Sequence, residues 1–224
     1  MKQIYFDVFD AKSDYVPLVV QVWNSDPGQV RYTEIECREE PQKAIDNYLT
    51  ASKYVKEVGS DWIPNLESEF TMTLVPSVFG AEIYTAPGGF CEARPFIDDI
   101  NDIYKFKDVD IYGGLTEKAI RHLRFLRDNK PDGVEIQPTR FMSPLDSAVV
   151  MRGGNFYLDL LENPTAAADF LEMITDVTVR LIHVMKNEIG QPVRECVGVR
   201  GTWYNGQRFS GDAIVNLSPE CIKK

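Results

Sequence analysis

Two acidic residues separated by one position, Glu67 and Glu69, form the arrangement in this sequence that is best suited to chemistry. They lie at the end of residues 61–70 (DWIPNLESEF), a segment that we predict to be a β-strand. Alternation along a strand places both glutamates on one face and Ser68 on the opposite face. Carboxylates at a strand end can stabilise positive charge that develops in a reaction. The simpler alternative is an acidic loop in contact with solvent.

Arginine is the second residue type that could take part in binding. Arg140 lies in a polar segment, residues 137–144, that follows a short apolar run, residues 134–136. Its planar guanidinium group suits a substrate carboxylate, although a surface arginine is an equally simple explanation. Arg152 falls at the end of a predicted helix, where a cation also stabilises the helix dipole.

The histidines and cysteines do not form a metal-binding pattern. His122 and His183 fall within predicted helices and have no acid or cysteine partner at ligand spacing, so we predict structural roles for both. The four cysteines are widely spaced, without a CxxC motif, which disfavours a zinc site. We expect reduced, mostly buried thiols in a cytosolic protein.

Composition excludes several classes of protein. The chain has 224 residues, a net charge of −10 and 44% hydrophobic residues. An acidic chain is a poor general nucleic-acid binder, because nucleic acids require a basic surface. No apolar run approaches the length of a membrane span, and the N-terminal segment lacks the apolar core of a signal peptide. We therefore predict a cytoplasmic protein that binds a small molecule rather than nucleic acid or membrane.

The central part of the chain contains the strongest structural pattern. The apolar run at 134–136 predicts a buried strand, and residues 137–144 form a turn that leads into helices. Helical pieces are expected at 145–151 and 156–161, followed by a helix of about 24 residues that starts at Asn163-Pro164. Strand, loop and helix in this order predict an α/β fold, in which the loops after the strands carry the chemistry.

The remaining elements follow from local patterns. We predict further strands at 16–23, 61–70 and 213–217, and helices at 41–58 and 116–128. Other local signals predict a short helix in 71–79 broken at Pro76, loops and short elements from 80 to 114, a hairpin turn at 204–207 and a helix start at 218–220.

From about residue 40 to residue 224 the sequence resembles the uroporphyrinogen decarboxylase superfamily, which includes cobalamin-linked methyltransferases. The resemblance depends on an ordered set of short motifs, none of which is diagnostic alone. These are the acidic strand 61–70 with Phe79-Gly80, Ser143-Pro144-Leu145-Asp146 with Gly153, Phe156-Leu158-Asp159-Leu160, Asn163-Pro164 with its long helix, and Asp212 with Val215 to Glu220.

The resemblance implies a (β/α)8 TIM-barrel-like fold, present here as a single domain over residues 1–224 without its C-terminal part. Such an incomplete barrel would leave apolar surface uncovered, so self-association is expected. The implied activity is decarboxylation of acetate side chains on an anionic tetrapyrrole, a reaction that needs no cofactor and no metal. In the resemblance, Glu67 and Glu69 match the acid that holds the pyrrole N–H groups. Arg140, Ser143 and Asp212 become candidates for binding the substrate.

The sequence also departs from the family, and these departures keep other functions open. It lacks the Arg-Gln-Ala-Gly-Arg signature of the decarboxylases and their tyrosine, since the equivalent region reads Ser147 to Val150. It also lacks the late His-x-Cys zinc ligands of the methyltransferases. The alternatives are a methyltransferase-like relative that acts on a corrinoid, and an inactive fragment or interaction module.

Overall fold

The computed structural model describes residues 2–20, 31–198 and 201–222, which divide into two compact units. The first unit comprises Met1–Glu69, Ile120–Arg140 and Met185–Arg208. The second comprises Phe70–Ala119, Phe141–Val184 and Phe209–Lys224. The organisation as a single barrel domain remains a prediction.

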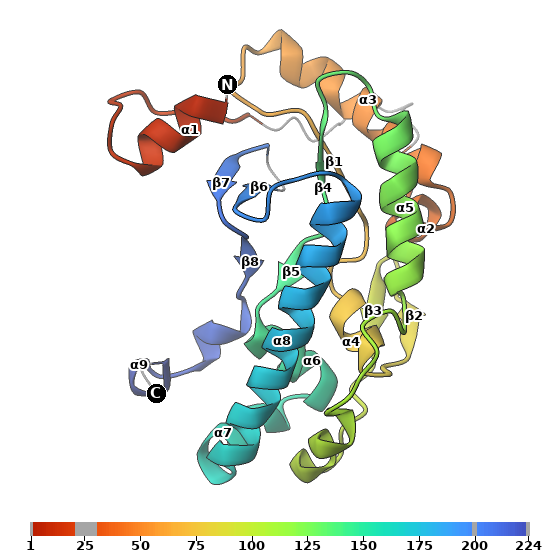
Figure 1. The fold of residues 1–224 in the computed structure, drawn as a ribbon, viewed down its shortest axis with the longest axis vertical. Helices are drawn as coiled ribbons and strands as arrows, with labels where there is room; N and C mark the ends of the chain where they lie inside the picture. Colours follow the sequence, from red (N-terminus) through yellow and green to blue (C-terminus); the bar gives the residue numbers. More distant parts are fainter. Residues whose placement is uncertain (1, 21–30, 199–200, 223–224) are drawn as a thin grey trace. The chain divides into compact units, whose positions relative to one another are not determined.

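A parallel pair of strands lies at the centre of the first unit (Figure 1). Strand β1 (Asn65–Glu67) pairs with β4 (Glu135–Gln137), with Leu66 opposite Ile136 and Glu67 opposite Gln137. The Ser68 N–H extends the ladder by donating to the Gln137 carbonyl oxygen at 3.1 Å. The prediction that 61–70 and 134–136 contain parallel strands of one sheet is confirmed, although both strands are short.

Helices α1 (Lys2–Phe9), α2 (Glu34–Glu39) and α3 (Pro41–Glu57) also belong to the first unit. The prediction of a helix at 41–58 is confirmed: Pro41 occupies the first turn, and Gly59 follows the helix at a φ of 65°. Strands β6 (Glu195–Val197) and β7 (Trp203–Asn205) form an antiparallel pair. Their apolar side chains join α1 in a small core of Tyr5, Ile63, Val197 and Trp203.

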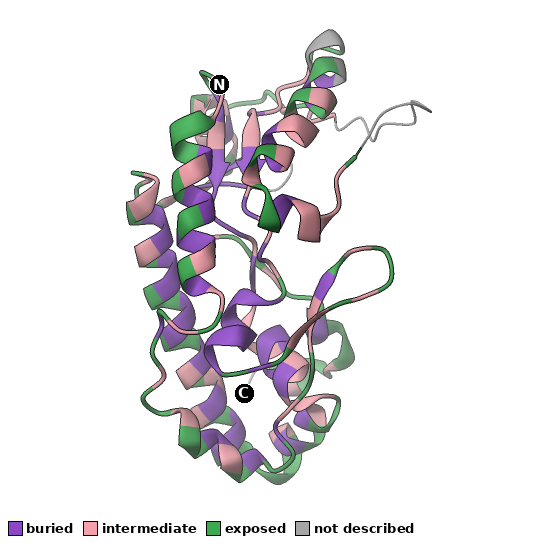
Figure 2. Cartoon of the chain, turned by 90° about the vertical axis from the view of Figure 1, so that its right-hand side faces the viewer, coloured by how far each residue is buried: buried purple, intermediate pink, exposed green. Residues whose placement is uncertain are grey.

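Helices α5 (Thr116–Asn129) and α8 (Pro164–Glu188) form where the sequence predicts them. Along both, buried and exposed residues alternate with helical periodicity (Figure 2). The buried positions of α8 include Phe170, Ile174, Val177, Leu181 and Met185. Near their C-terminal ends, Arg124 binds Glu188 through two hydrogen bonds of 2.7 and 2.8 Å.

The second unit contains mostly short elements. Helices α6 (Pro144–Arg152) and α7 (Asn155–Glu162) match the predicted helical pieces, and α6 is capped by the Ser143 hydroxyl. The other elements of this unit are α4 (Leu74–Val78), β2 (Ile83–Thr85), β3 (Cys91–Ala93), η1 (Ile100–Phe106), β5 (Phe141–Met142), β8 (Phe209–Ser210), η2 (Ala213–Asn216) and α9 (Pro219–Ile222). Strands β2 and β3 are antiparallel, whereas β5 and β8 are parallel.

Two predicted strands are wrong where the structure describes them. Residues 16–20 have no strand partner: Leu18 exchanges hydrogen bonds of 2.9 Å with Asp61, and Val16 is 80% exposed. Residues 21–23 of that prediction lie outside the described part of the chain. Residues 213–217 contain the 3₁₀ helix η2, because the Asp146 carboxylate accepts a hydrogen bond from the Ala213 N–H at 2.6 Å and holds the start of the turn.

Two further predictions, both based on residues that favour turns, are wrong. The predicted turn at 204–207 does not connect β6 and β7, which pair as antiparallel strands; the Gly198 N–H donates to the Thr202 carbonyl oxygen at 2.7 Å. Asn205-Gly206 instead ends β7. The predicted helix break at Pro76 is also wrong. Pro76 lies in the first turn of α4, where a backbone N–H would have no partner within the helix, so its absence does not destabilise the helix.

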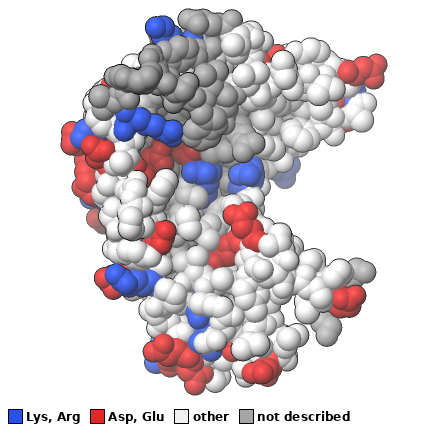
Figure 3. Space-filling view, turned by 180° about the vertical axis from the view of Figure 1, so that it is seen from behind, with Lys and Arg blue, Asp and Glu red and all other residues white. Residues whose placement is uncertain are grey.

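The described chain is a mixed α/β protein whose strands form four two-stranded sheets. No closed barrel is formed by the residues that the structure describes. No helix among them combines the length and the apolar character needed to cross a membrane. On the face shown in Figure 3, acidic and basic side chains are interspersed. Self-association remains a prediction.

Gly114 tests the packing of the second unit. Its φ is 56°, and a Cβ atom there would collide with the backbone carbonyl of Ser77. We expect Gly114→Ala to lower the free energy of unfolding by about 3 kcal/mol, through a strained φ and a steric clash. Gly59→Ala is the matched control, since Gly59 has a φ of 65° and open space around it. Gly59→Ala should lower the free energy of unfolding, measured by denaturant unfolding, by about 1 kcal/mol. Equal losses in the two variants would contradict the close contact between Gly114 and Ser77.

Candidate acid site

The structure brings Glu67 and Arg140 together at the carboxyl ends of β1 and β4. Arg140 follows β4 by three residues, and its Nε donates a hydrogen bond to Glu67 Oε1. The Glu67 side chain is 17% exposed and that of Arg140 is 39% exposed, so the ion pair lies at the edge of the core and remains accessible to solvent. Glu69 is half-buried two residues beyond Glu67.

Helix α2 supplies two charged residues that the sequence analysis did not connect with this site. The Arg38 Nε donates to the backbone carbonyl oxygen of Glu69, and its terminal nitrogen lies 2.5 Å from Glu34 Oε1. The Arg38 side chain is only 3% exposed. Spacing of four residues indicates the Glu34–Arg38 pair within a helix, but no local pattern indicates the contact with the strand end.

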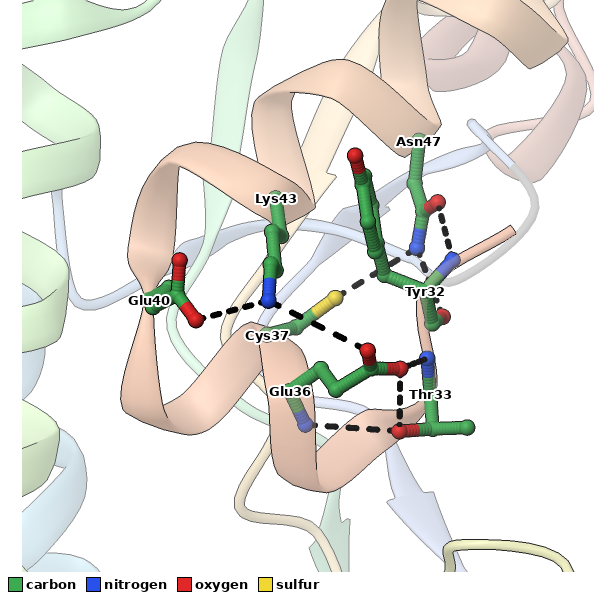
Figure 4. A network of polar contacts seen from close by, with 7 residues as sticks. All are labelled: Tyr32, Thr33, Glu36, Cys37, Glu40, Lys43 and Asn47. Atoms are coloured by element: carbon green, nitrogen blue, oxygen red, sulfur yellow. Dashed lines mark hydrogen bonds and ion pairs between the residues drawn. The ribbon is translucent and has the colours of Figure 1, made fainter. Parts of the chain in front are cut away.

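Helix α2 is fixed in place by a polar network at its N-terminus (Figure 4). Thr33 and Glu36 form a capping box, in which the Glu36 carboxylate accepts from the Thr33 N–H at 2.8 Å. The Asn47 amide of α3 makes two hydrogen bonds of 2.9 Å with the Tyr32 backbone, one donated and one accepted. Lys43 adds ion pairs to Glu40 at 2.6 Å and Glu36 at 3.9 Å. This network holds Arg38 and Glu34 against the strand end.

Burial changes the proton affinity of both strand-end glutamates. The pKa of Glu69 is raised to about 8, mainly by burial and then by the negative charges of Glu67 and Glu34, while the cations Arg140 and Arg38 oppose the rise. Burial also raises the pKa of Glu67, but Arg140 works against this by its charge and its hydrogen bond. With a pKa of about 8, the Glu69 carboxyl group therefore retains its proton near neutral pH.

This arrangement separates the chemical roles of two neighbouring acids. Glu67 is held as the partner of Arg140, whereas Glu69 has a neutral carboxyl group that can donate a proton at pH 7. Two carboxyl groups whose environments differ in this way form a common pattern in acid–base catalysis. The geometry is suited to delivering a proton to a substrate bound at the strand ends.

Ser143 and Asp212, the other candidates from the sequence, both lie in the second unit. Ser143 caps α6: its hydroxyl accepts from the Asp146 N–H at 3.1 Å and donates to the Asp146 carboxylate at 2.6 Å. Ser210 links the two candidates, since its carbonyl oxygen accepts from the Ser143 N–H and its hydroxyl lies 3.4 Å from the Asp212 carboxylate. Their role in substrate binding remains a prediction.

Two other polar residues that the sequence singles out make contacts within the described structure. Arg152 bonds the Asp159 carboxylate at 2.8 Å and the carbonyl oxygens of Ile97 and Asp98. His122 is buried, with its Nε2 3.0 Å from the Cys37 carbonyl oxygen. All four cysteines are free thiols, and three of them are buried. Within the described ranges, no group of His, Cys, Asp or Glu side chains could hold a metal ion.

Comparison with known proteins gives one informative likeness. No protein-family profile matches the sequence, and no curated protein matches it. Among solved structures, the chain resembles a methyltransferase from Methanosarcina mazei with a TM-score of 0.56 and 11% sequence identity. The match covers 84% of this chain and 56% of that protein, so the chain spans little more than half of its length. At this identity the likeness establishes a shared fold.

The raised pKa of Glu69 predicts how stability depends on pH. The folded pKa is about 8, against an ordinary value of 4.5, so between these values the folded protein binds a proton that the unfolded chain releases. The free energy of unfolding therefore falls as pH rises through this window. Glu69→Gln should remove this dependence and exceed the wild type at pH 9 by on the order of 2 kcal/mol, while matching it near pH 5.

Denaturant unfolding at several pH values, together with carboxyl titration by NMR, measures this difference. Glu162→Gln, an exposed change on α7, serves as the control and should leave the pH profile unchanged. A titration of Glu69 near its ordinary pKa would contradict the assignment of a neutral acid.

Proposed function

We propose that this chain is a methyltransferase-like enzyme of the uroporphyrinogen decarboxylase superfamily, with Glu69 as its proton donor. Two observations, one from the sequence and one from the fold, support this proposal. The sequence resembles a superfamily that includes cobalamin-linked methyltransferases, and the fold is similar to that of a methyltransferase. The comparisons favour this activity over decarboxylation, for which they offer no support.

The observation that carries the proposal is the pair of unlike carboxyl groups at the end of β1. A methyl group bound to oxygen is difficult to transfer, because the departing oxygen would leave as an anion. A positioned acid prevents this by giving the oxygen a proton as the carbon–oxygen bond breaks. Glu69 is suited to this role because it holds a proton at neutral pH. The hydrogen bond from Arg140 to Glu67 fixes the local geometry.

The position of the site supports a barrel architecture. Barrel enzymes carry their catalytic residues at the carboxyl ends of parallel strands. Glu67 ends β1, and Arg140 follows β4 at the corresponding edge of the parallel pair. We propose that the chain forms part of such a (β/α)8 barrel and binds a small molecule, a corrinoid or related tetrapyrrole, with Arg140 as a contact at the acid site. Ser143 and Asp212 remain proposed substrate-binding residues of the second unit.

The metal requirement of related methyltransferases is not met by the residues described. Cys37, Cys91 and Cys196 are buried free thiols, and no cluster of potential ligands surrounds any of them in the described ranges. We therefore derive no step through a protein-bound metal and assign to this chain the positioning of the substrate and the delivery of a proton.

Methyl transfer by the full-length protein tests the proposal. Reduced cobalamin should gain a methyl group from methanol or a methoxyarene, detected by the absorbance of methylcobalamin. Glu69→Gln should lower kcat by about 100-fold or more, because it removes the proton and keeps the shape. Activity of the wild type should decline above pH 8, as Glu69 loses its proton. Glu162→Gln should keep full activity.

The outcome of this assay separates the competing functions. Conversion of uroporphyrinogen to coproporphyrinogen, without methyl transfer, would replace the proposal with the decarboxylase. Absence of both activities in a folded protein would favour an interaction module.

A further inference from the structure

Arg38 is the cation that reaches the proposed proton donor from helix α2. Its Nε donates to the backbone carbonyl oxygen of Glu69, and a terminal nitrogen lies 2.5 Å from Glu34 Oε1. The Arg38 side chain is 3% exposed and that of Glu34 is 18% exposed. The donors of a guanidinium group have fixed directions, so Arg38 binds both partners at once only while α2 keeps its place against the strand end.

A buried cation at this place presents an electrostatic problem for an acid that must keep its proton. A cation near a carboxyl group favours the ionised form. Burial is the main cause of the raised pKa of Glu69, followed by the negative charges of Glu67 and Glu34, and the charges of Arg140 and Arg38 oppose the rise. Because the Glu34 carboxylate contacts the Arg38 guanidinium directly, it offsets the cation that would otherwise promote loss of the proton.

We propose that Glu34 and Arg38 act together as a positioning pair for the proton donor. Arg38 fixes the backbone at Glu69, and Glu34 neutralises Arg38 so that the fixed carboxyl group keeps its proton. The inference rests on the proposed function, because it assigns the pair to the acid that donates the proton. Both residues act through Glu69 and not on the reacting atoms.

The charged groups that act on the Glu69 carboxyl group come from three parts of the first unit. They are Glu67 on β1, Glu34 and Arg38 on α2, and Arg140 after β4. Cys37 on α2 also interacts with Glu69, but burial and then the charge of Glu69 raise the pKa of its thiol to about 12, so it stays neutral in the range of interest. Replacing Glu34 or Arg38 therefore changes the charge near Glu69 and leaves the bond between Arg140 and Glu67 in place.

The titration of Glu69, followed by NMR in the full-length protein, tests the pair. Glu34→Gln removes a negative charge and leaves the guanidinium unopposed, so the midpoint should fall from about 8 by about one pH unit. Arg38→Gln removes the cation, so the midpoint should rise by about one pH unit. The double variant should return close to the wild-type midpoint, because the two charges are lost together.

Opposite shifts are the decisive result. Both single variants break the same ion pair, so a merely structural role predicts the same change in both. Glu39→Gln, an exposed change on the same helix, is the matched control and should leave the midpoint unchanged. Shifts in the same direction, or a Glu34→Gln midpoint equal to that of the wild type, would overturn the pair.

Arg38→Lys keeps the test decisive where Arg38→Gln does not fold. A lysine keeps the positive charge but lacks the planar fork, so the backbone at Glu69 is no longer fixed while the charge near its carboxyl group is retained. The midpoint should stay near that of the wild type, and kcat for methyl transfer should fall by about tenfold through misplacement of the acid. An unchanged kcat in this variant would contradict the positioning role of Arg38.

The pH profile of methyl transfer separates this inference from the proposed function. The decline at alkaline pH should begin about one pH unit lower in Glu34→Gln than in the wild type, with KM unchanged. Opposite shifts of the Glu69 midpoint without methyl transfer in the wild type would support the pair and end the proposed function alone. Methyl transfer that requires Glu69, with a midpoint that does not respond to Glu34→Gln, would end this inference alone.

Discussion

The parallel register between β1 and β4 is the constraint on which the candidate site depends. Parallel strands end at the same edge of a sheet, so the residues that follow them meet even when they are distant in sequence. Glu67 and Arg140 are separated by 73 positions and share a hydrogen bond for this reason. The same register places Gln137 directly beside Glu67. A shift by one residue would turn these side chains to the opposite face and separate the groups.

Partial burial determines how these charged groups behave. A carboxylate that loses contact with water is destabilised unless a cation or hydrogen-bond donors replace the solvent. Glu67 has such a partner in Arg140, whereas for Glu69 the cation nearby, Arg38, binds the backbone carbonyl and Glu34. Two similar residues at one strand end therefore have different electrostatic surroundings, because the available cations are distributed unequally between them.

Helix α2 shows how a short element can influence the strand end. A helix of six residues is marginal by itself, since few internal hydrogen bonds offset the ordering of its backbone. The capping box of Thr33 and Glu36 and the contacts of Asn47 stabilise it from outside. Arg38 is consequently held in a buried position, where it fixes the backbone at Glu69. The conformation of the acid thus depends on residues 20 to 40 positions away.

The sequence by itself determined the long helices, the two parallel strands and the candidate status of Glu67, Glu69 and Arg140, because these follow from local periodicity, capping residues and strand alternation. It did not determine the short strands β2, β3, β5 and β8, or that residues 213–216 form a helical turn. Those outcomes depend on distant partners, as where Asp146 holds the Ala213 N–H. Only the tertiary structure decided which cation pairs with which acid. Pairing and burial are properties of groups brought together from separate parts of the chain, and no local pattern encodes them.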